Sequence, residues 1–178
     1  DDMGIIDDVA ETSAIARSVN STDGVYVVPA FTGLGAPYWD ADARGAIYGL
    51  TRGTGRAHIV RAALESLAYQ VSDLAVAMEA DAGVPISALN VDGGASANDF
   101  LMQFQSDLLR CELRRPQNTE TTALGAAFLA GLATGFWKDA EVLCELRSSD
   151  EHFEPSMDDA RREALLEGWK RAVRKTMG

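Results

Sequence analysis

Two adjacent glycines stand between a short strand-like run and a helical pattern, where they could bring a phosphate group close to the backbone. Residues 88–91 form the run, Asp92, Gly93 and Gly94 follow, and Asn98 precedes the helical pattern. Paired glycines let a ligand approach the main chain, and the first turn of a helix offers free amides to an anion. The segment has neither the Gly-Lys-Ser/Thr ending of a Walker loop nor the spacing of a dinucleotide-binding loop. From the residues alone a tight turn without a ligand is the better explanation, and Asn98 is expected to cap the helix, reach a ligand, or both.

A histidine and a glutamate lie on a long helical segment that follows a second glycine-containing strand. The strand carries Gly45, Ile47, Gly49 and Leu50. We expect His58 to be a helix-start residue without chemistry, because no Ser or Cys nucleophile with an orienting carboxylate lies nearby in sequence. Glu65 is expected to be a solvated or structural charge without a catalytic role. Cys111 and Cys144 have no Cys or His partners at metal-ligand spacing, so neither a disulfide framework nor a zinc site is expected.

The elements that must position these residues alternate between helices and strands. Helices are predicted over residues 1–18, 57–82, 98–110, 123–136 and 157–176, and strands over residues 25–28, 46–50, 88–91 and 111–115, the last as an edge strand. Residues 30–44 are predicted to be an ordered, packed loop. This order implies an α/β fold with a mixed or parallel sheet and helices on its faces.

Three of the predicted helices carry distinctive apolar patterns. The helix at residues 57–82 has a single apolar stripe formed by Ile59, Ala63, Leu67, Val71, Leu74 and Met78. The helix at 123–136 is rich in small and apolar residues and is predicted to be buried, with Thr121 or Thr122 as its cap. The last helix carries Leu165, Leu166, Trp169 and Val173 on one stripe, which we expect to pack on the domain rather than to form an oligomer contact.

Composition and charge limit the kinds of partner. The chain has 178 residues, enough for one domain, and 16 Lys+Arg against 27 Asp+Glu give a net charge of −11. This charge argues against nucleic acid and anionic lipid as partners. The most apolar stretch, residues 123–137, is shorter than the roughly 20 residues of a membrane helix. No signal peptide pattern opens the sequence, so a cytoplasmic location is expected, and the first residues are expected to continue a helix of a longer protein.

At residues 45–65 the sequence resembles the second signature of the FGGY family of sugar and polyol kinases. The matching pattern is Gly-x-Ile-x-Gly-Leu, seven residues, then His-Ile-x-x-Ala-Ala-Leu-Glu. Five surrounding phrases resemble the family members that phosphorylate glycerol: PAFTGLGAPYWD (29–40), GLTRG (49–53), VDGG (91–94), LMQFQ (101–105) and TTALGAA (121–127). The resemblance is dense from residue 25 to about residue 137.

The resemblance implies the actin-like, hexokinase-like (ribonuclease H-like) ATPase fold, in which two α/β domains close around ATP, Mg²⁺ and substrate. Residues 1–178 resemble most of the C-terminal domain, a single domain with a mixed sheet and helices on both faces but without its N-terminal strands. In the family a DGG-x-x-x-N segment faces the adenosine, which implies nucleotide contacts at Gly94 and Asn98 in a loop shaped by Gly93 and Asp92. The resemblance therefore reverses the preference for a plain turn.

The resemblance also implies what this chain does not supply. The family's aspartate base, most polyol-binding residues and the magnesium ligands belong to the part that precedes this chain, so residues 1–178 are expected to hold no catalytic or metal-binding residue. The implied reaction is ATP plus glycerol giving ADP and glycerol 3-phosphate, with the chain inactive alone. The implied partners are ATP or ADP, glycerol and its own N-terminal domain, and a homo-oligomer is also expected. The alternatives are a kinase for another sugar or polyol, such as a pentulose, a non-catalytic actin-like nucleotide-binding module, and a structural domain without a ligand.

Overall fold

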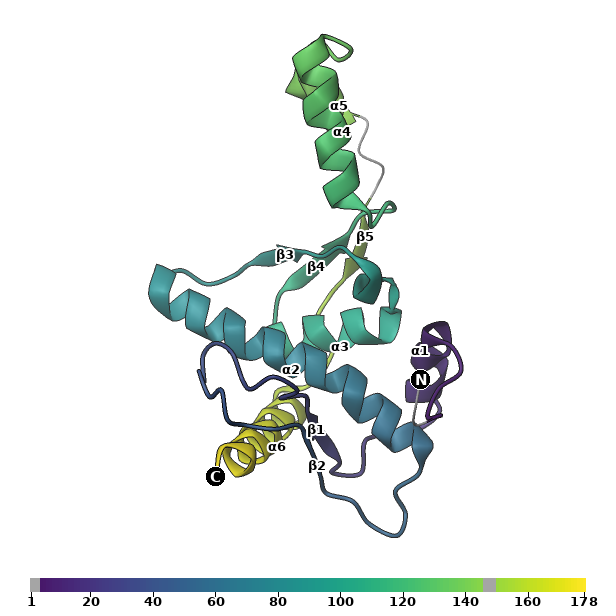
Figure 1. Cartoon of the computed structure of the whole chain (residues 1–178), viewed down its shortest axis with the longest axis vertical. Helices are drawn as coiled ribbons and strands as arrows, with labels where there is room; N and C mark the ends of the chain where they lie inside the picture. Colours follow the sequence, from purple (N-terminus) through teal and green to yellow (C-terminus); the bar gives the residue numbers. More distant parts are fainter. Residues whose placement is uncertain (1–3, 146–149) are drawn as a thin grey trace.

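The computed structural model describes residues 4–145 and 150–178, whose helices and strands are arranged as Figure 1 shows. The helices are α1 (Thr12–Arg17), α2 (Arg56–Ala82), α3 (Asp99–Leu109), α4 (Thr121–Thr134), α5 (Ala140–Glu145) and α6 (Asp159–Met177). The strands are β1 (Tyr26–Val28), β2 (Ala46–Tyr48), β3 (Ala88–Asn90), β4 (Glu112–Arg115) and β5 (Glu151–Phe153). Two short 3₁₀ helices, Val9–Glu11 and Gly94–Ala97, precede α1 and α3.

The helix boundaries follow from local capping. The side chain of Asn98 accepts a hydrogen bond from the Leu101 amide at the start of α3, and Asp158 accepts one from the Arg161 amide at the start of α6. α2 ends at Gly83, which adopts the left-handed conformation that glycine favours. The predicted helices at 57–82, 98–110 and 157–176 are therefore confirmed to within about two residues.

The described strands form two separate sheets. β3 pairs in parallel with β4, and β4 pairs antiparallel with β5, so the larger sheet is mixed, as expected. β1 and β2 form an antiparallel pair. The prediction that residues 111–115 are an edge strand is wrong, because β4 lies between β3 and β5. The error arises because β5 follows β4 by 35 residues and its three residues carry no strand pattern that stands out in the sequence.

The core lies where α2, α3, α6 and β1 meet. Tyr69 of α2 stacks on Trp169 of α6 with ring centroids 5.2 Å apart, and Phe104 of α3 meets the Tyr69 ring edge-on at 5.6 Å. All three rings are buried. The stripe on α6 therefore packs on the domain, as predicted.

A carboxylate at the middle of α2 fastens the loop of residues 30–44 to this core. Oδ2 of Asp73 accepts hydrogen bonds from the Tyr38 hydroxyl at 2.8 Å and from the Trp169 indole at 2.6 Å. Within the loop, Leu34 and Asp40 exchange two backbone hydrogen bonds of 2.7 and 3.0 Å. The segment is thus ordered and packed, as its glycines and aromatic residues predict.

The predicted helix over residues 1–18 is wrong in its extent. The described part of this segment is helical only from Val9 onward, as one 3₁₀ turn followed by the six residues of α1. Asp8 starts the 3₁₀ turn by accepting a hydrogen bond from the Ala10 amide. Ile5 and Ile6, which the helical spacing included, are not helical and instead line a cavity beside β2.

α4 differs most from expectation, because it is not buried. Together with α5 it extends away from the body that α2 and α3 form (Figure 1). Within α4 only Gly131 is buried, and Leu129 is 71% exposed. Neither Thr121 nor Thr122 caps the helix, since Glu120 occupies the N-cap position without a side-chain hydrogen bond. The sequence correctly predicts an apolar helix, but most of its residues are exposed, and Trp137 packs against Phe128 and Gly131.

Candidate functional site

The loop of residues 92–98 lies between the parallel strand β3 and the start of α3, as the glycine pair predicts. The Val91 amide donates to the Arg114 carbonyl at 3.0 Å, and the Gly93 amide donates to the Thr119 carbonyl at 3.0 Å. These two hydrogen bonds continue the β3–β4 pairing into the loop. The loop is therefore held on one side by the segment that follows β4.

Gly93 and Gly94 differ in backbone conformation and therefore in why glycine occupies each position. Gly93 has a φ of +79°, which side chains other than glycine rarely adopt. Gly94 has an ordinary φ, and a Cβ placed on it would meet no atom within 4 Å. Neither backbone strain nor internal packing therefore accounts for glycine at position 94, and the space in front of its main chain is open.

Both polar atoms of the Asn98 side chain form hydrogen bonds within the protein. Oδ1 accepts from the Leu101 amide at 3.1 Å, and Nδ2 donates to Oγ1 of Thr12 at 3.1 Å. The residue thus caps α3 and ties the loop to α1. The capping role that the sequence predicts is confirmed, and the contact with Thr12 is an additional one that the sequence does not predict.

Two further side chains fix the outer part of the loop. Asp92 accepts a hydrogen bond through Oδ2 from the hydroxyl of Thr121, the first residue of α4. Arg115, at the end of β4, donates to the Ser96 carbonyl inside the loop and forms an ion pair with Asp99 at 2.6 Å. Sequence reasoning missed Arg115, although an arginine closing the strand beside β3 was a signal that could have drawn attention to it.

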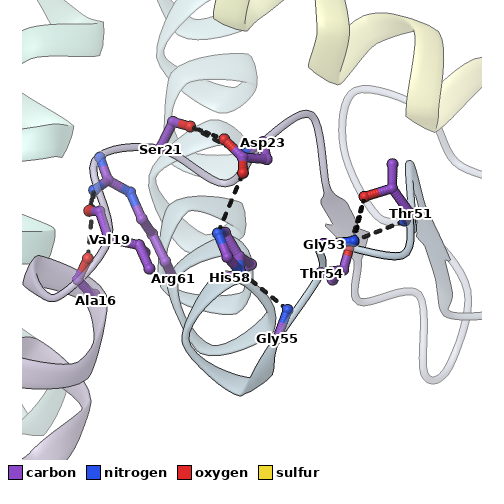
Figure 2. Close-up of polar contacts among 10 residues, drawn as sticks. All are labelled: Ala16, Val19, Ser21, Asp23, Thr51, Gly53, Thr54, Gly55, His58 and Arg61. Atoms are coloured by element: carbon purple, nitrogen blue, oxygen red, sulfur yellow. Dashed lines mark hydrogen bonds and ion pairs between the residues drawn. The ribbon is translucent and has the colours of Figure 1, made fainter.

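His58 belongs to a separate cluster at the start of α2, which Figure 2 shows. Its Nδ1 accepts from the Gly55 amide at 3.0 Å, and its Nε2 lies 3.4 Å from a carboxylate oxygen of Asp23. Because Nδ1 accepts, the proton of the neutral ring sits on Nε2 and faces Asp23. His58 thus caps the helix, so its predicted place at the start of α2 is confirmed.

Arg61, one turn further along α2, joins three helices. Its Nε donates to Glu65 at 2.8 Å. Its Nη1 donates to the Val19 carbonyl at 2.5 Å and the Ala16 carbonyl at 3.3 Å, beside the end of α1 (Figure 2). The guanidinium carbon also lies 5.0 Å from the centre of the Phe100 ring on α3. Arg61 therefore holds α1 and α3 against α2.

Glu65 is buried, so the alternative that it is a solvated charge is wrong. Burial raises the pKa of its carboxyl, and the hydrogen bond and charge of Arg61 oppose that shift. The opposite charges four residues apart in an apolar helix were the signal for this pair. The pair positions α1, whose Thr12 in turn contacts Asn98, so it supports the glycine loop without touching it.

The part of the chain that the structure describes holds no group of three or more His, Cys, Asp or Glu side chains able to bind a metal ion. Nor is any helix within residues 4–145 or 150–178 long and apolar enough to cross a membrane. Cys111 is a buried, free thiol.

The architecture places the chain in a known class of ATPase domain. It superposes on the crystal structure of Plasmodium falciparum glycerol kinase with ADP with a TM-score of 0.88 and 41% sequence identity, over 98% of this chain and 35% of that one. Gluconate kinase from Lactobacillus acidophilus superposes with a TM-score of 0.78 at 23% identity, over 98% of this chain and 36% of that one, which shows a shared fold. The fold is the actin-like, ribonuclease H-like ATPase fold.

The sequence identifies the family within that class. Residues 4–134 match the C-terminal domain of the FGGY family of carbohydrate kinases. The chain belongs to this family.

The similar proteins are much longer than this chain. Glycerol kinase from Thermoanaerobacter pseudethanolicus is 58% identical over 177 residues, which cover 99% of this chain and 36% of that protein. Glycerol kinase from Geobacillus kaustophilus is 56% identical with the same coverage. The chain thus spans about a third of the length of the curated relatives it matches.

Proposed function

We propose that this chain is part of an ATP-dependent glycerol kinase, which converts ATP and glycerol into ADP and glycerol 3-phosphate. Residues 1–178 would form most of the C-terminal domain and supply the adenosine-facing side of the nucleotide cleft. Relatives that are 55–58% identical to nearly the whole chain carry the glycerol kinase name, which supports this substrate over another sugar or polyol.

The open space at Gly94 is the observation that carries the nucleotide contact. A Cβ on Gly94 would meet no protein atom within 4 Å, so a ligand can approach the main chain at this point of the loop between β3 and α3. Gly93 supplies the turn, and Asp92 holds the loop to α4 through Thr121. Asn98 keeps the loop beside α3 and α1, and one amide hydrogen of its Nδ2 remains available to the nucleotide.

The rest of the catalytic machinery is assigned to the polypeptide outside this chain. The family resemblance assigns the Mg²⁺ ligands to the part that precedes this chain, and among the described residues no three acidic, His or Cys side chains converge. We therefore place the Mg²⁺ ligands, the base that takes the glycerol proton and most glycerol contacts in the N-terminal part of the protein. A cytoplasmic location and assembly into a homo-oligomer also belong to this proposal.

ATP affinity tests the nucleotide contact directly. The test protein, called the joined protein below, is this chain fused to the part that precedes it in the Thermoanaerobacter pseudethanolicus relative. Gly94→Val should weaken ATP binding in calorimetric titration by about tenfold or more, equivalent to about 1.4 kcal/mol. The protein should keep its fold, because the added side chain meets open space.

Gly35→Val is the matched control. Gly35 also has an ordinary φ, and a Cβ placed on it would meet no atom within 4 Å, but it lies in the loop of residues 30–44. ATP affinity should stay at the starting value in this variant. Unchanged affinity in Gly94→Val would remove the nucleotide from this loop.

A further inference from the structure

The 3₁₀ turn Gly94–Ala97 is held internally by short-range hydrogen bonds. The Gly93 carbonyl accepts from the Ser96 amide at 3.1 Å and from the Ser96 hydroxyl at 2.7 Å. The Asn98 amide donates to the Ala95 carbonyl at 3.2 Å. Hydrogen bonds of this type have poorer geometry than those of an α-helix, and such turns are short. The shape of this turn therefore depends on contacts with its surroundings.

Arg115 supplies such a contact from the larger sheet. Its Nη1 donates to the Ser96 carbonyl, two residues after Gly94. A hydrogen bond from a charged donor is stronger than one between two neutral groups. Because Ser96 is buried, water has little access to take the place of the guanidinium if the arginine is removed. The turn thus relies on Arg115 for its position against β4.

Two carboxylates and an aromatic ring hold the guanidinium in place. Nη2 lies 2.6 Å from Oδ1 of Asp99, the first residue of α3, and 2.5 Å from Oε2 of Glu151 on β5. The guanidinium carbon lies 5.0 Å from the centre of the Phe153 ring, also on β5. The Arg115 side chain is 11% exposed, whereas those of Asp99 and Glu151 are 54% and 56% exposed. The arginine therefore connects the turn to both α3 and β5.

The neighbouring arginine of β4 has a different environment. Side chains alternate along a strand, so Arg115 lies on the same side of β4 as the buried Leu113, and Arg114 lies on the opposite side. Arg114 pairs with Glu112 of the same strand at 2.6 Å, and its side chain is 45% exposed. Arg114 thus bonds within its own strand, whereas Arg115 reaches the glycine loop. The two arginines form a matched pair for an experiment.

We propose that Arg115 is a positioning residue for the nucleotide. By holding the Ser96 carbonyl against β4, it keeps the main chain at Gly94 in the position that the nucleotide contacts. Both Nη atoms already donate within the protein, so Arg115 itself is assigned no contact with the nucleotide. The inference rests on the proposed function, because it requires the nucleotide to contact this loop. It adds to that contact a residue outside the loop.

Steady-state kinetics of the joined protein test this role. Arg115→Met removes the donors, and water can solvate the two half-exposed carboxylates that lose their partner. The KM for ATP should rise about fivefold or more, while kcat and the KM for glycerol stay within about twofold. Arg114→Met should leave all three constants unchanged. A merely structural role of Arg115 would instead lower the amount of active protein and hence kcat, without a selective change in the KM for ATP.

A double variant tests whether the effect passes through the loop. Arg115→Met should raise the KM for ATP much less in a Gly94→Val background than in the unchanged protein, because substitutions that act on one contact are not additive. An unaltered KM for ATP in Arg115→Met overturns the positioning role, and so does an equal proportional rise in both backgrounds. Arg115→Lys, which keeps the charge but lacks the planar fork, gives the same comparisons if Arg115→Met does not fold.

The single variants separate the two proposals. If Gly94→Val leaves ATP affinity unchanged, the nucleotide contact of the proposed function fails, and the role of Arg115 fails with it. If Gly94→Val weakens ATP binding and Arg115→Met does not, the positioning role alone is overturned. Weaker ATP binding in both variants, with the smaller effect of Arg115→Met in the Gly94→Val background, supports both proposals.

Discussion

Asp73 ties together three segments that are distant in sequence, because one of its oxygens accepts from both Tyr38 and Trp169. Burial raises the pKa of its carboxyl, while the hydrogen bonds from Trp169 and Tyr38 oppose the shift. A carboxyl group with a raised pKa in the folded state binds more protons there than in the unfolded chain. Its contribution to stability is therefore full below the ordinary pKa of about 4 and is lost as pH rises through the raised value.

Asp73→Asn should make stability less dependent on pH. An amide oxygen in the place of Oδ2 can still accept both hydrogen bonds, and the neutral side chain has no charge to bury. The fall in unfolding free energy between about pH 4 and about pH 7 should shrink in urea titrations of the joined protein. Asp81→Asn, at an exposed position of the same helix, should leave the fall unchanged. An equally steep fall in Asp73→Asn would contradict this account.

The Arg61–Glu65 pair should be far more important for stability than an exposed pair of the same spacing. Arg61→Met leaves the buried Glu65 carboxylate without its partner, which costs about 3–5 kcal/mol. Arg171→Met breaks the exposed pair of Arg171 and Glu167, also four residues apart, and should cost about 1 kcal/mol or less. Chemical denaturation of both variants measures the difference. Similar losses would mean that Arg61 is not a structural partner of Glu65.

At the level of elements, the cap of α3 also positions the glycine loop. Asn98→Ala removes the cap and the hydrogen bond to Thr12, and should destabilise the joined protein by about 1 kcal/mol. Asn98→Asp keeps an oxygen for the Leu101 amide but loses the donor to Thr12. It should therefore lose less than half as much stability in thermal unfolding. Equal losses would place the main contribution of Asn98 in the contact with α1.

The close contact of α6 with β1 depends on a glycine within the helix. A Cβ on Gly168 would collide with the Tyr26 ring and hydroxyl. Gly168→Ala should therefore destabilise the protein by about 1–3 kcal/mol, although alanine favours helices over glycine. Lys170→Ala, at an exposed position of α6, is the control and should change the thermal midpoint little. A stabilised Gly168→Ala variant would show that α6 can move away from β1.

The elements also show what sequence patterns can and cannot predict. Asn98 and Gly83 indicate helix ends because capping depends on the local sequence. The loop at Gly93 and Gly94 is predictable because the glycine pair directly follows a strand. The patterns of α2 and α4 mark the apolar sides correctly, but those sides are not the ones this chain buries. Periodicity identifies the apolar side of a helix but not the surface that covers it, and the contacts of Arg61 and Asn98 with α1 depend on tertiary packing that no local pattern encodes.

For the whole molecule, the proposed division of labour predicts that catalysis needs both parts. The isolated 178-residue chain should form no glycerol 3-phosphate from ATP and glycerol, because the base and Mg²⁺ ligands are assigned elsewhere. The joined protein should do so in a coupled ADP-release assay. Turnover by the isolated chain, retained after repurification, would contradict the assignment of the catalytic groups.

The exposed apolar surfaces of α2 and α4 affect the solubility of this chain in a cell. Exposed apolar helices are what chaperones bind and what drives aggregation of partly folded intermediates. If the first part of the protein is translated before this chain, it is already present when Leu67 and Leu129 emerge from the ribosome. The order of synthesis would then protect the C-terminal domain, and a chain made alone should accumulate in inclusion bodies.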